Sequence, residues 1–346
     1  MAIFRFGFNE AQANYSSKNR YARWFSRAEK NPDHATHRLR ADPIFRPGVN
    51  VTRKLKPDDT IFTIGSCFAR ELEQSLARQD YRVLSLVEER MPNGVPAGWV
   101  NRYNTYAILR ELEWASGERE FPRDAFLRTR LMSYADLYSH PMFGAESYAT
   151  VSARRKGITE YFSRVFSASM LTISLGLAEC WYDRRLDDYI NFVPHLAAVG
   201  GKKRPLLSDP KRFEFRVLDF QENMENLERL FALLERHNPG CHIVVTVSPV
   251  AMTATFSDRD VVVANTLTKS MLRCCAETWQ SLHPGKIDYF PSYEMAVYSD
   301  RRLVLMDDGV HIQPAFVDQV IAHFAQNFIE GRQVAEPAKR AVEPVA

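Results

Sequence analysis

The chain has 346 residues, of which 45% are hydrophobic, and its formal net charge is +3. This length and composition are typical of a globular protein with one large or two modest domains. A total charge this close to neutral excludes an inference of nucleic-acid or anionic-membrane binding from the charge alone.

The N-terminal residues lack an apolar core of signal-peptide length, because Arg5 and Asn9 interrupt the run early. Charges also break every apolar run before it reaches the roughly 18 residues of a membrane-spanning helix. The five cysteines show no repeated spacing, which indicates reduced thiols rather than a disulfide framework. We therefore expect a cytoplasmic protein without a membrane span, and no spacing of His and Cys predicts a metal site.

Residues 1–55 form a distinct segment in which Lys and Arg outnumber Asp and Glu and aromatic side chains are interspersed. Its hydrophobic periodicity is weak, so we interpret it as an arm. Basic and aromatic side chains together can bind a nucleic acid or another anionic polymer. The interpretation that we prefer is an extended arm that packs its aromatic side chains on the main domain and leaves its charges in water.

From Asp59 onward, short apolar runs alternate with amphipathic stretches, as in strands that helices cover on both faces. In chain order, strands are predicted near residues 61–64, 81–87, 170–175, 242–247 and 287–290. Helices are predicted around 69–76, 106–114, 157–166, 220–237 and 261–279, and after Pro314. The run 170–175 is almost wholly apolar, which is typical of a parallel strand buried on both faces.

These elements predict a three-layer α/β/α sandwich around a mainly parallel sheet of about five strands, of the flavodoxin-like class. We assign this domain to residues 56–330. The tail, 331–346, is rich in Pro, Ala and charge, so we predict that it is disordered. Because ligands of such sheets bind beyond the carboxyl ends of the strands, we expect the chemistry at that edge.

The first motif lies at the end of the first predicted strand, where Gly65, Ser66 and Cys67 lead into a helix. The free N–H groups and the dipole of a helix N-terminus lower a thiol pKa and stabilise an oxyanion. Gly65 permits the tight turn. In the structural alternative, Ser66 caps the helix and Cys67 is a small buried hydrophobe. The tripeptide alone favours neither interpretation.

The second motif, Asp308-Gly309-Val310-His311, precedes the last predicted helix. An Asp three residues before a His on a turn can hold the imidazole and stabilise its protonated form. The other ring nitrogen is then free to accept a proton from a nucleophile. An isolated motif of this kind is more often a solvent-facing turn with a capping Asp, so its weight comes from the combination with the first motif.

The segment Gly65 to Ala69 reads GSCFA, and the chain from about Lys56 to Gly331 resembles the bacterial GSCFA-domain family. That family is similar to the SGNH, or GDSL-like, hydrolase superfamily. In that superfamily the nucleophile follows the first strand, and a DxxH turn before the last helix supplies an Asp and a His. The resemblance therefore implies an acyl-transferring or ester-hydrolysing enzyme with an SGNH-like fold.

The resemblance also implies roles for individual residues. The first block of the superfamily reads Gly-Asp-Ser, so alignment on Gly65 places Ser66 at the Asp position and Cys67 at the nucleophile position. Cys67 is our first choice as nucleophile, and Ser66 is the alternative. Asp308 and His311 take the places of the acid/base pair.

A third block of the superfamily, Gly-x-Asn-Asp, donates an Asn to the oxyanion hole, and the stretch from Gly176 to Glu179 resembles it without that Asn. A carboxylate does not stabilise an oxyanion, so we expect Glu179 to orient the substrate or to form a hydrogen bond with it. Asn104 or a loop amide can provide the missing donor, with capping of the next helix as an equal alternative for Asn104. Backbone amides near Cys67 and Gly176 are expected to receive the oxyanion, at the turn that Gly65 forms. Ser248, at the end of strand 242–247, is expected to shape the substrate wall.

Lys269 and Arg273 lie four residues apart on one predicted helix. They can bind a phosphate of an acyl carrier or a sugar acid, but we prefer a solvent-facing helix surface as their interpretation.

Together these features predict a covalent acyl-enzyme that acts on a small-molecule or carbohydrate ester. Water as the acceptor gives an esterase or thioesterase. A sugar hydroxyl gives an O-acyltransferase, for which acyl-CoA is a candidate co-substrate, and we expect neither a resident cofactor nor a nucleic-acid partner. The rival hypothesis is a non-catalytic binding protein for a carbohydrate or a carrier, and the sequence gives no indication of the oligomeric state.

Overall fold

The computed structural model describes residues 3–27, 31–87, 97–128, 133–139, 145–194, 197–199, 202–204 and 210–330. The predicted disordered tail, 331–346, lies outside these described residues. Among the described helices, none combines the length and the hydropathy needed to cross a bilayer.

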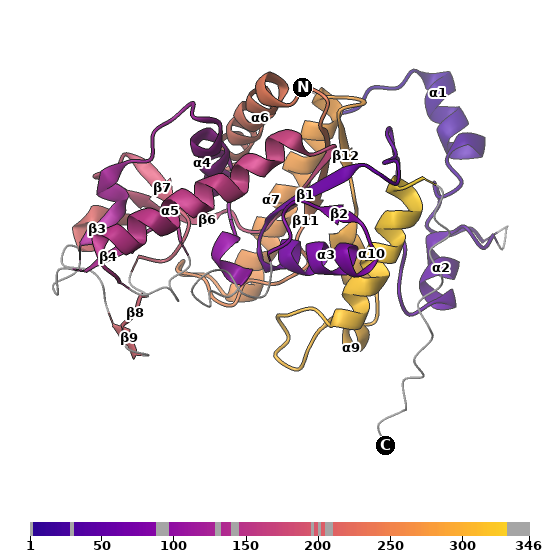
Figure 1. The fold of residues 1–346 in the computed structure, drawn as a ribbon. Coiled ribbons are helices and arrows are strands. Elements are labelled where there is room, and N and C mark those ends of the chain that lie inside the picture. The colour runs from indigo at the N-terminus through magenta and orange to yellow at the C-terminus, as the bar shows by residue number, and fades with distance from the viewer. Residues whose placement is uncertain are drawn as a thin grey trace.

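A five-stranded parallel sheet forms the centre of the molecule, with the strand order β12-β11-β5-β1-β2 (Figure 1). Its strands are β1 (Thr60–Gly65), β2 (Arg82–Val83), β5 (Met170–Leu175), β11 (His242–Val247) and β12 (Ile287–Tyr289). The prediction of an α/β fold with about five parallel strands is confirmed. The strands β1, β5 and β11 are buried almost throughout, which explains their nearly unbroken apolar sequences.

Two hydrophobic clusters, one on each face of the sheet, hold the layers together. Within β1, Phe62 and Ile64 belong to one cluster and Ile61 to the other, as the alternation of side chains along a strand requires. The first cluster includes residues of α4 (Thr105–Ser116), α5 (Tyr148–Ser163), α6 (Phe220–His237) and α7 (Val261–Leu282). The second includes residues of α3 (Cys67–Arg78), α8 (Ser292–Tyr298), α9 (Arg301–Val304) and α10 (Pro314–Phe328).

Local sequence determines where several of these helices begin. Asp219 and Glu222 form a capping box at the start of α6, and Asn104 caps α4 through its side chain. Pro314 occupies the first turn of α10, where its missing N–H costs no hydrogen bond. Short 3-10 helices lie at Ala97–Val100, Arg123–Ala125, Arg164–Ser167 and Pro210–Arg212.

Short antiparallel strands lie beside the parallel core, and the sequence analysis did not predict them. The chain segments between β5 and α6 form a three-stranded sheet of β6 (Glu179–Asp183), β7 (Asp188–Ile190) and β10 (Phe213–Val217), with the order β10-β6-β7. Two further pairs are β3 (Phe126–Arg128) with β4 (Tyr134–Asp136), and β8 (Ala197–Val199) with β9 (Lys202–Arg204). Figure 1 shows β6 and β7 on the side of the molecule away from α10.

The N-terminal segment joins the main domain through its last part. Hydrogen bonds connect the backbone N–H groups of Phe45, Thr52 and Leu55 to residues of the main domain, at 2.7 to 2.9 Å. Before this part lie α1 (Phe8–Ala13), a π-helix (Asn14–Lys18) and α2 (Ala35–Ala41).

The expectation that this arm packs its aromatic side chains on the main domain is wrong for its first half. The aromatic side chains of residues 3–27 are all exposed, namely those of Phe4, Phe6, Phe8, Tyr15, Tyr21, Trp24 and Phe25. Of these, Trp24 touches Tyr298 of the main domain by one edge contact, as Phe45 does from the second half. The ring contacts of Trp24 and Phe45 meet at Tyr298, whereas Ile44, Val49 and Val51 of the second half pack on the hydrophobic cluster of the main domain.

Candidate active site

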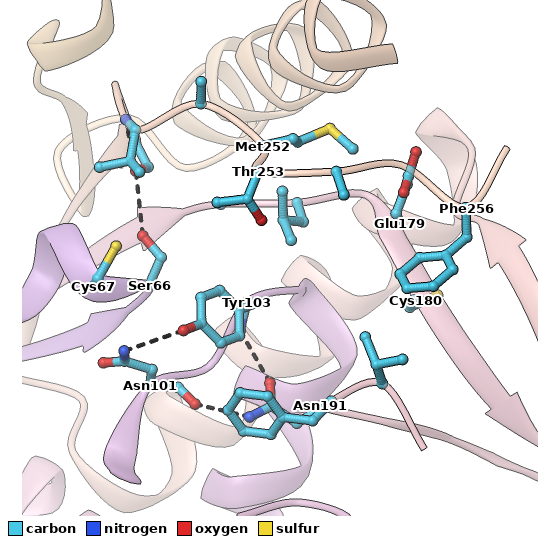
Figure 2. A pocket seen from close by; sticks show the side chains of 18 of the residues that line it. Ser66, Cys67, Asn101, Tyr103, Glu179, Cys180, Asn191, Met252, Thr253 and Phe256 are labelled. Carbon is cyan, nitrogen blue, oxygen red and sulfur yellow. Dashed lines mark hydrogen bonds between the residues drawn. The ribbon is translucent and has the colours of Figure 1, made fainter. Parts of the chain in front are cut away.

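The topology of the sheet brings two loops together at the carboxyl ends of β1 and β5. The chain leads from β1 to β2 on one side, whereas β5 leads to β11 and β12 on the other, so the order changes direction between β1 and β5. Such a switch point is where open α/β sheets bind ligands. A cavity of about 570 Å³ lies there (Figure 2). Its polar lining includes Ser66, Cys67, Asn101, Tyr103, Gly176, Glu179, Ser248, Lys269 and His311.

Gly65 forms the corner between β1 and α3. Its φ angle is +148°, and a Cβ atom at this position would lie 2.3 Å from the carbonyl oxygen of Ser174 in the neighbouring strand. A larger residue is therefore excluded both by backbone conformation and by space. The carbonyl oxygen of Gly65 accepts the N–H of Arg102 at 2.7 Å. The corner that carries Ser66 and Cys67 is thus held rigidly against β5.

Ser66 occupies the N-cap position of α3, but its side chain makes no capping hydrogen bond. Instead, its Oγ donates to the Oγ of Ser248 at 3.2 Å. Ser66 is only 4% exposed and lines the cavity. The structural alternative of a capping side chain therefore does not apply to this residue.

Cys67 is the first residue of α3, and Figure 2 shows its sulfur beside the Ser66 side chain. Burial raises the pKa of the Cys67 thiol, and the carboxyl group of Glu71 raises it further. The backbone N–H groups at the helix start and the charge of Lys269 act in the opposite direction but are weaker. The expected lowering of the thiol pKa by the helix N-terminus is thus outweighed by desolvation. At rest the sulfur carries its proton at neutral pH.

Glu71 lies one turn after Cys67 on α3, and the sequence analysis did not single it out. Burial raises the pKa of its carboxyl group to about 7, whereas His311 lowers it. Glu71 therefore interacts electrostatically with both Cys67 and His311. The spacing of four residues between Cys67 and Glu71 was the signal in the sequence, because it places both on one helix face.

The predicted acid/base pair is formed within one turn. His311 Nδ1 lies 2.6 Å from Asp308 Oδ2, and Asp308 Oδ1 accepts the backbone N–H groups of Val310 and His311. These bonds lower the pKa of Asp308 to about 2, the bond to His311 being the largest cause. An ionised carboxylate only accepts, so Nδ1 carries the proton of this hydrogen bond.

The pair is half exposed to solvent, with side-chain exposures of 48% for His311 and 49% for Asp308. His311 nevertheless lines the cavity, as does Val310. Val310 also packs on the hydrophobic cluster that includes Cys67. The structure therefore brings the two distant motifs of the sequence to one cavity.

The Gly176 backbone lies directly against Ser66 and forms part of the cavity wall. A Cβ atom on Gly176 would lie 3.2 Å from the Ser66 Cβ and 3.0 Å from the Tyr103 carbonyl oxygen. The backbone of Gly176 can approach the corner only because this side chain is absent. The N–H of the next residue, Leu177, donates to the same Tyr103 oxygen at 2.8 Å.

Asn101 and Tyr103 are cavity residues whose role the sequence analysis did not predict. Asn101 Nδ2 donates to the Tyr103 hydroxyl at 3.3 Å, and burial raises the pKa of Tyr103 to about 12. The phenol is therefore protonated and has a hydrogen to donate. Figure 2 shows Asn101 and the hydroxyl end of Tyr103 on the same side of the cavity as Ser66 and Cys67.

The other predicted site residues have different positions. Asn104 Oδ1 accepts the N–H of Ala107 at 2.8 Å, and Asn104 is absent from the cavity lining, so its capping alternative is the one found. Glu179 lines the cavity and accepts a hydrogen bond from Thr255 at 2.5 Å. Ser248 lines the cavity beside Ser66, as expected for a wall residue.

An aromatic cluster lines the far end of the cavity. Trp181 and Phe215, from the antiparallel sheet, and Phe256 pack edge to face or tilted, with ring centroids 5.1 to 5.9 Å apart. Figure 2 shows Phe256 with Glu179 and Cys180 at the end away from Ser66 and Cys67. A ligand that reaches the thiol therefore has an aromatic surface within the same cavity.

Lys269 corrects the expectation of a solvent-facing helix surface. It is 1% exposed, and its Nζ donates to the Gly176 carbonyl oxygen at 2.9 Å. Arg273 instead forms ion pairs with Glu277 and Glu294, at 2.5 and 2.7 Å. One residue of the predicted pair thus belongs to the cavity, and the other to an ion-pair network.

Comparison with known proteins agrees with these motifs. The sequence model of the GSCFA family matches residues 60–324. The chain belongs to the GSCFA family. The match includes β1 and the corner with Gly65, Ser66 and Cys67, and it extends into α10, so this GSCFA family protein carries both motifs within the matched region.

Several solved structures are similar to the GSCFA family protein at low identity. An acetyl esterase mutant with an acetate ion is 11% identical over 76% of this chain and 92% of its own, with a TM-score of 0.30. A carbohydrate esterase of family 2 with a carbohydrate-binding domain, from Corynascus thermopiles (Myceliophthora fergusii), is 13% identical over 80% and 67%, with a TM-score of 0.35. A carbohydrate esterase of family 3 from Talaromyces cellulolyticus is 12% identical over 78% and 95%, with a TM-score of 0.30. No curated protein sequence matches this chain.

Proposed function

We propose that this GSCFA family protein is an acyl-group hydrolase or O-acyltransferase that forms a covalent acyl-enzyme on Cys67. One observation carries the proposal. Cys67, at the N-terminus of α3, shares a cavity with His311, and the Nδ1 atom of His311 is bonded at 2.6 Å to the ionised Asp308. A nucleophile, a base and a group that orients the base are the parts that acyl transfer requires.

In the proposed reaction, the Cys67 sulfur attacks the carbonyl carbon of an ester while His311 Nε2 takes the thiol proton. The carbon–sulfur bond forms, and the carbonyl π electrons move to the oxygen. When the carbonyl re-forms, the bond to the alcohol oxygen breaks and His311 returns the proton to that oxygen. Water or an acceptor hydroxyl, deprotonated by His311, then attacks the thioester and releases Cys67.

The protonation states of the site explain why a base is needed. The raised pKa of the Cys67 thiol means that little thiolate exists before substrate binds. The proton must therefore leave during the attack, and a neutral imidazole with a free Nε2 is suited to receive it. Asp308 then stabilises the imidazolium that forms.

Ser66 is the alternative nucleophile. It lies in the same cavity, but its hydroxyl donates to Ser248, and this bond would have to break before Ser66 could pass its proton to His311. Glu71 interacts electrostatically with both Cys67 and His311, which indicates that the thiol and the imidazole lie near the same carboxyl group. These two observations support Cys67 as the nucleophile.

The aromatic end of the cavity supports a substrate with a flat or apolar part, such as the sugar ring of an acylated carbohydrate. Trp181, Phe215 and Phe256 provide ring faces and edges of the kind that pack on sugars and on acyl chains. We propose an acylated or acyl-accepting carbohydrate as the substrate class, with acyl-CoA as a candidate donor.

A non-catalytic binding protein for a carbohydrate or a carrier is the second candidate. Its support is that Ser66 and Ala178 stand where the superfamily pattern has the Asp of its first block and the Asn of its third. A binder would use the same cavity without forming a covalent intermediate.

Acyl-adduct mapping separates these hypotheses. We expect incubation with p-nitrophenyl acetate, followed by acid quench and peptide mass spectrometry, to place an acetyl group on Cys67, and to do so much more slowly in a His311→Ala variant. Cys67→Ala should abolish the adduct and Ser66→Ala should keep it. Cys274 is exposed and outside the cavity, so its labelling is the matched control and should be equal in all variants. A protein that acylates neither Cys67 nor Ser66 is a binder.

A further inference from the structure

Lys269 places a positive charge inside the cavity. It lies on α7, it is 1% exposed, and it lines the cavity together with Ser66 and Cys67. An ammonium group has three donors, and the hydrogen bond to the Gly176 carbonyl oxygen uses one. Within the described part of the chain, no carboxylate forms an ion pair with Lys269. When Lys269 is protonated, its charge is therefore not compensated by a carboxylate among the described residues.

Such a charge is costly to bury, and the protein shows the cost. Desolvation lowers the pKa of Lys269 to about 7, because the buried ammonium form is disfavoured. A methionine or leucine would fill the same space without this penalty. A negative charge that enters the cavity or forms there would stabilise the protonated lysine and offset this penalty.

The Cys67 thiolate does not supply that charge at rest. The titratable group that acts on Lys269 is the Cys67 thiol, and Cys67 is in turn affected by Glu71 and Lys269. Burial and Glu71 keep the thiol protonated despite the attraction of Lys269. The negative charge must then belong to the substrate or to an intermediate of its reaction.

The position of Lys269 favours a reaction intermediate, rather than the substrate, as the source of this negative charge. The Gly176 carbonyl oxygen is bonded to Lys269, and the Gly176 backbone touches Ser66, with 3.2 Å from a Cβ on Gly176 to the Ser66 Cβ. One backbone unit thus separates the ammonium group from the corner where Cys67 attacks. The sequence also lacks the Asn that serves as oxyanion donor in the superfamily pattern.

We propose that Lys269 is a catalytic residue that binds the oxyanion of the tetrahedral intermediate formed on Cys67. The inference rests on the acyl-enzyme function proposed above. As the sulfur bonds to the carbonyl carbon and His311 takes the thiol proton, the negative charge arises on the carbonyl oxygen, and the ammonium group neutralises it. When the carbonyl re-forms and the alcohol leaves, Lys269 keeps its proton and returns to its resting contact.

Steady-state hydrolysis of p-nitrophenyl acetate by Lys269→Met tests the inference. Loss of one oxyanion donor should lower kcat by about 10²–10³-fold and change KM by less than about threefold, because the charge acts on the intermediate and not on bound ester. Lys269→Arg should restore part of kcat. Lys286→Met is the matched control, since Lys286 pairs with Glu235 outside the cavity, and it should behave as the wild type.

The pH profile distinguishes this role from a structural one. Because Lys269 must be protonated, kcat/KM of the wild type should fall as pH rises through about 7, the pKa of Lys269. This alkaline limb should be absent in Lys269→Met and should move to higher pH in Lys269→Arg. The thermal midpoint of Lys269→Met should also exceed that of the wild type at pH 6, because the wild type loses stability as pH falls through the depressed pKa of its folded state.

Each outcome of these experiments either supports or overturns the proposed role of Lys269. A folded Lys269→Met variant with kcat within about threefold of the wild type overturns the role of Lys269 alone. If Lys269→Met does not fold, an alkaline limb that stays in place in Lys269→Arg overturns it equally. A wild-type protein that forms no acyl adduct on Cys67 or Ser66 overturns the acyl-enzyme itself, and the role of Lys269 with it.

Discussion

His311 and Asp308 are joined by two hydrogen bonds within a single turn, Nδ1 to Oδ2 at 2.6 Å and the His311 N–H to Oδ1 at 2.9 Å, and Oδ1 also accepts the N–H of Val310 at 2.9 Å. One carboxylate therefore sets both the shape of the turn and the direction of the imidazole. A substitution that keeps the shape of the turn but no longer orients the imidazole would test the chemistry without disturbing the fold.

Asp308→Asn is that change. The amide oxygen can still accept the two backbone N–H groups, but the neutral side chain no longer stabilises an imidazolium or selects the tautomer with Nε2 free. We expect acylation of Cys67 to slow by roughly 10²–10⁴-fold with little change in the thermal midpoint. The exposed neighbour Asp307 is the control, and Asp307→Asn should acylate at the wild-type rate. Equal rates for both variants would remove Asp308 from the mechanism.

Glu71→Gln should make Cys67 more reactive. Above pH 7 the carboxyl group of Glu71 is ionised and raises the thiol pKa, so its removal lowers that pKa. The rate of iodoacetamide labelling of Cys67 at pH 8 should therefore increase. Cys274 provides the internal control, because it is exposed and separate from the cavity. A labelling rate that stays unchanged or falls contradicts the electrostatic link.

The same substitution should change stability with a defined sign. Burial raises the folded-state pKa of Glu71 from 4.5 to about 7, so its stabilising contribution is complete below pH 4.5 and is lost as pH rises through 7. We expect Glu71→Gln to be more stable than the wild type at pH 8 by roughly 1–2 kcal/mol, after allowance for its partial exposure, and not at pH 5. Urea denaturation at the two pH values measures the difference.

Gly65→Ala and Gly117→Ala separate steric clash from backbone strain. Both glycines have positive φ angles, +148° and +78°. A Cβ at Gly65 would lie 2.3 Å from the Ser174 carbonyl oxygen, whereas a Cβ at Gly117 would meet nothing within 4 Å. We expect losses of roughly 3 kcal/mol or more for Gly65→Ala and about 1 kcal/mol for Gly117→Ala in urea denaturation. Similar losses would show that β1 and β5 can separate to admit a side chain.

Phe256→Ala should affect substrate selection without affecting the reaction. Phe256 lies at the end of the cavity away from Cys67, so hydrolysis of p-nitrophenyl acetate should stay near the wild-type rate (Figure 2). With an acetylated sugar, we expect KM to rise about tenfold through loss of ring packing. Phe220→Ala, which removes an equally exposed ring outside the cavity, should change neither. A fall in kcat for both esters would place Phe256 in the reaction itself.

The parallel core could be predicted because its strands are long and buried on both faces. The limits predicted for the strands 170–175 and 242–247 agree with β5 and β11. The predicted strand 81–87 is reduced to β2 (Arg82–Val83), because the Ser85 carbonyl oxygen accepts the Tyr161 hydroxyl at 2.7 Å instead of extending the ladder. An edge strand of this kind depends on tertiary contacts that no local pattern reveals.

The antiparallel sheet was not predicted for a related reason. The strand β7 spans only Asp188–Ile190, and β6 and β10 have mixed polar and aromatic sequences. Such segments become strands through pairing with each other, since Trp181 lies opposite both Ile190 and Phe215. The end of the cavity that holds Ser66 and Cys67 could therefore be predicted from the sequence, whereas the aromatic end could not.

In the site, the two motifs were predictable because both carry chemically distinctive residues at fixed spacing. Lys269 was not, because helix periodicity does not show which face the tertiary structure covers. On α7, Val262 and Val263 are 69% and 53% exposed, whereas Lys269 is 1% exposed. Hydrophobicity alone predicts that the valines are buried and that the lysine is exposed. Lys269 lies about two turns after these valines on α7, so its burial reflects where along the helix the cavity lies.

The walls of the cavity come from two parts of the chain, the parallel sheet with its helices and the short antiparallel strands. Cys67 and Lys269 belong to helices on the parallel core, whereas Trp181 and Phe215 belong to strands added between β5 and α6. Substitutions, insertions or deletions in the added strands can therefore alter which molecules enter the cavity while Cys67 and Lys269 keep their places. Within one lineage, this arrangement allows the range of bound molecules to change while the residues at the Cys67 end of the cavity stay the same.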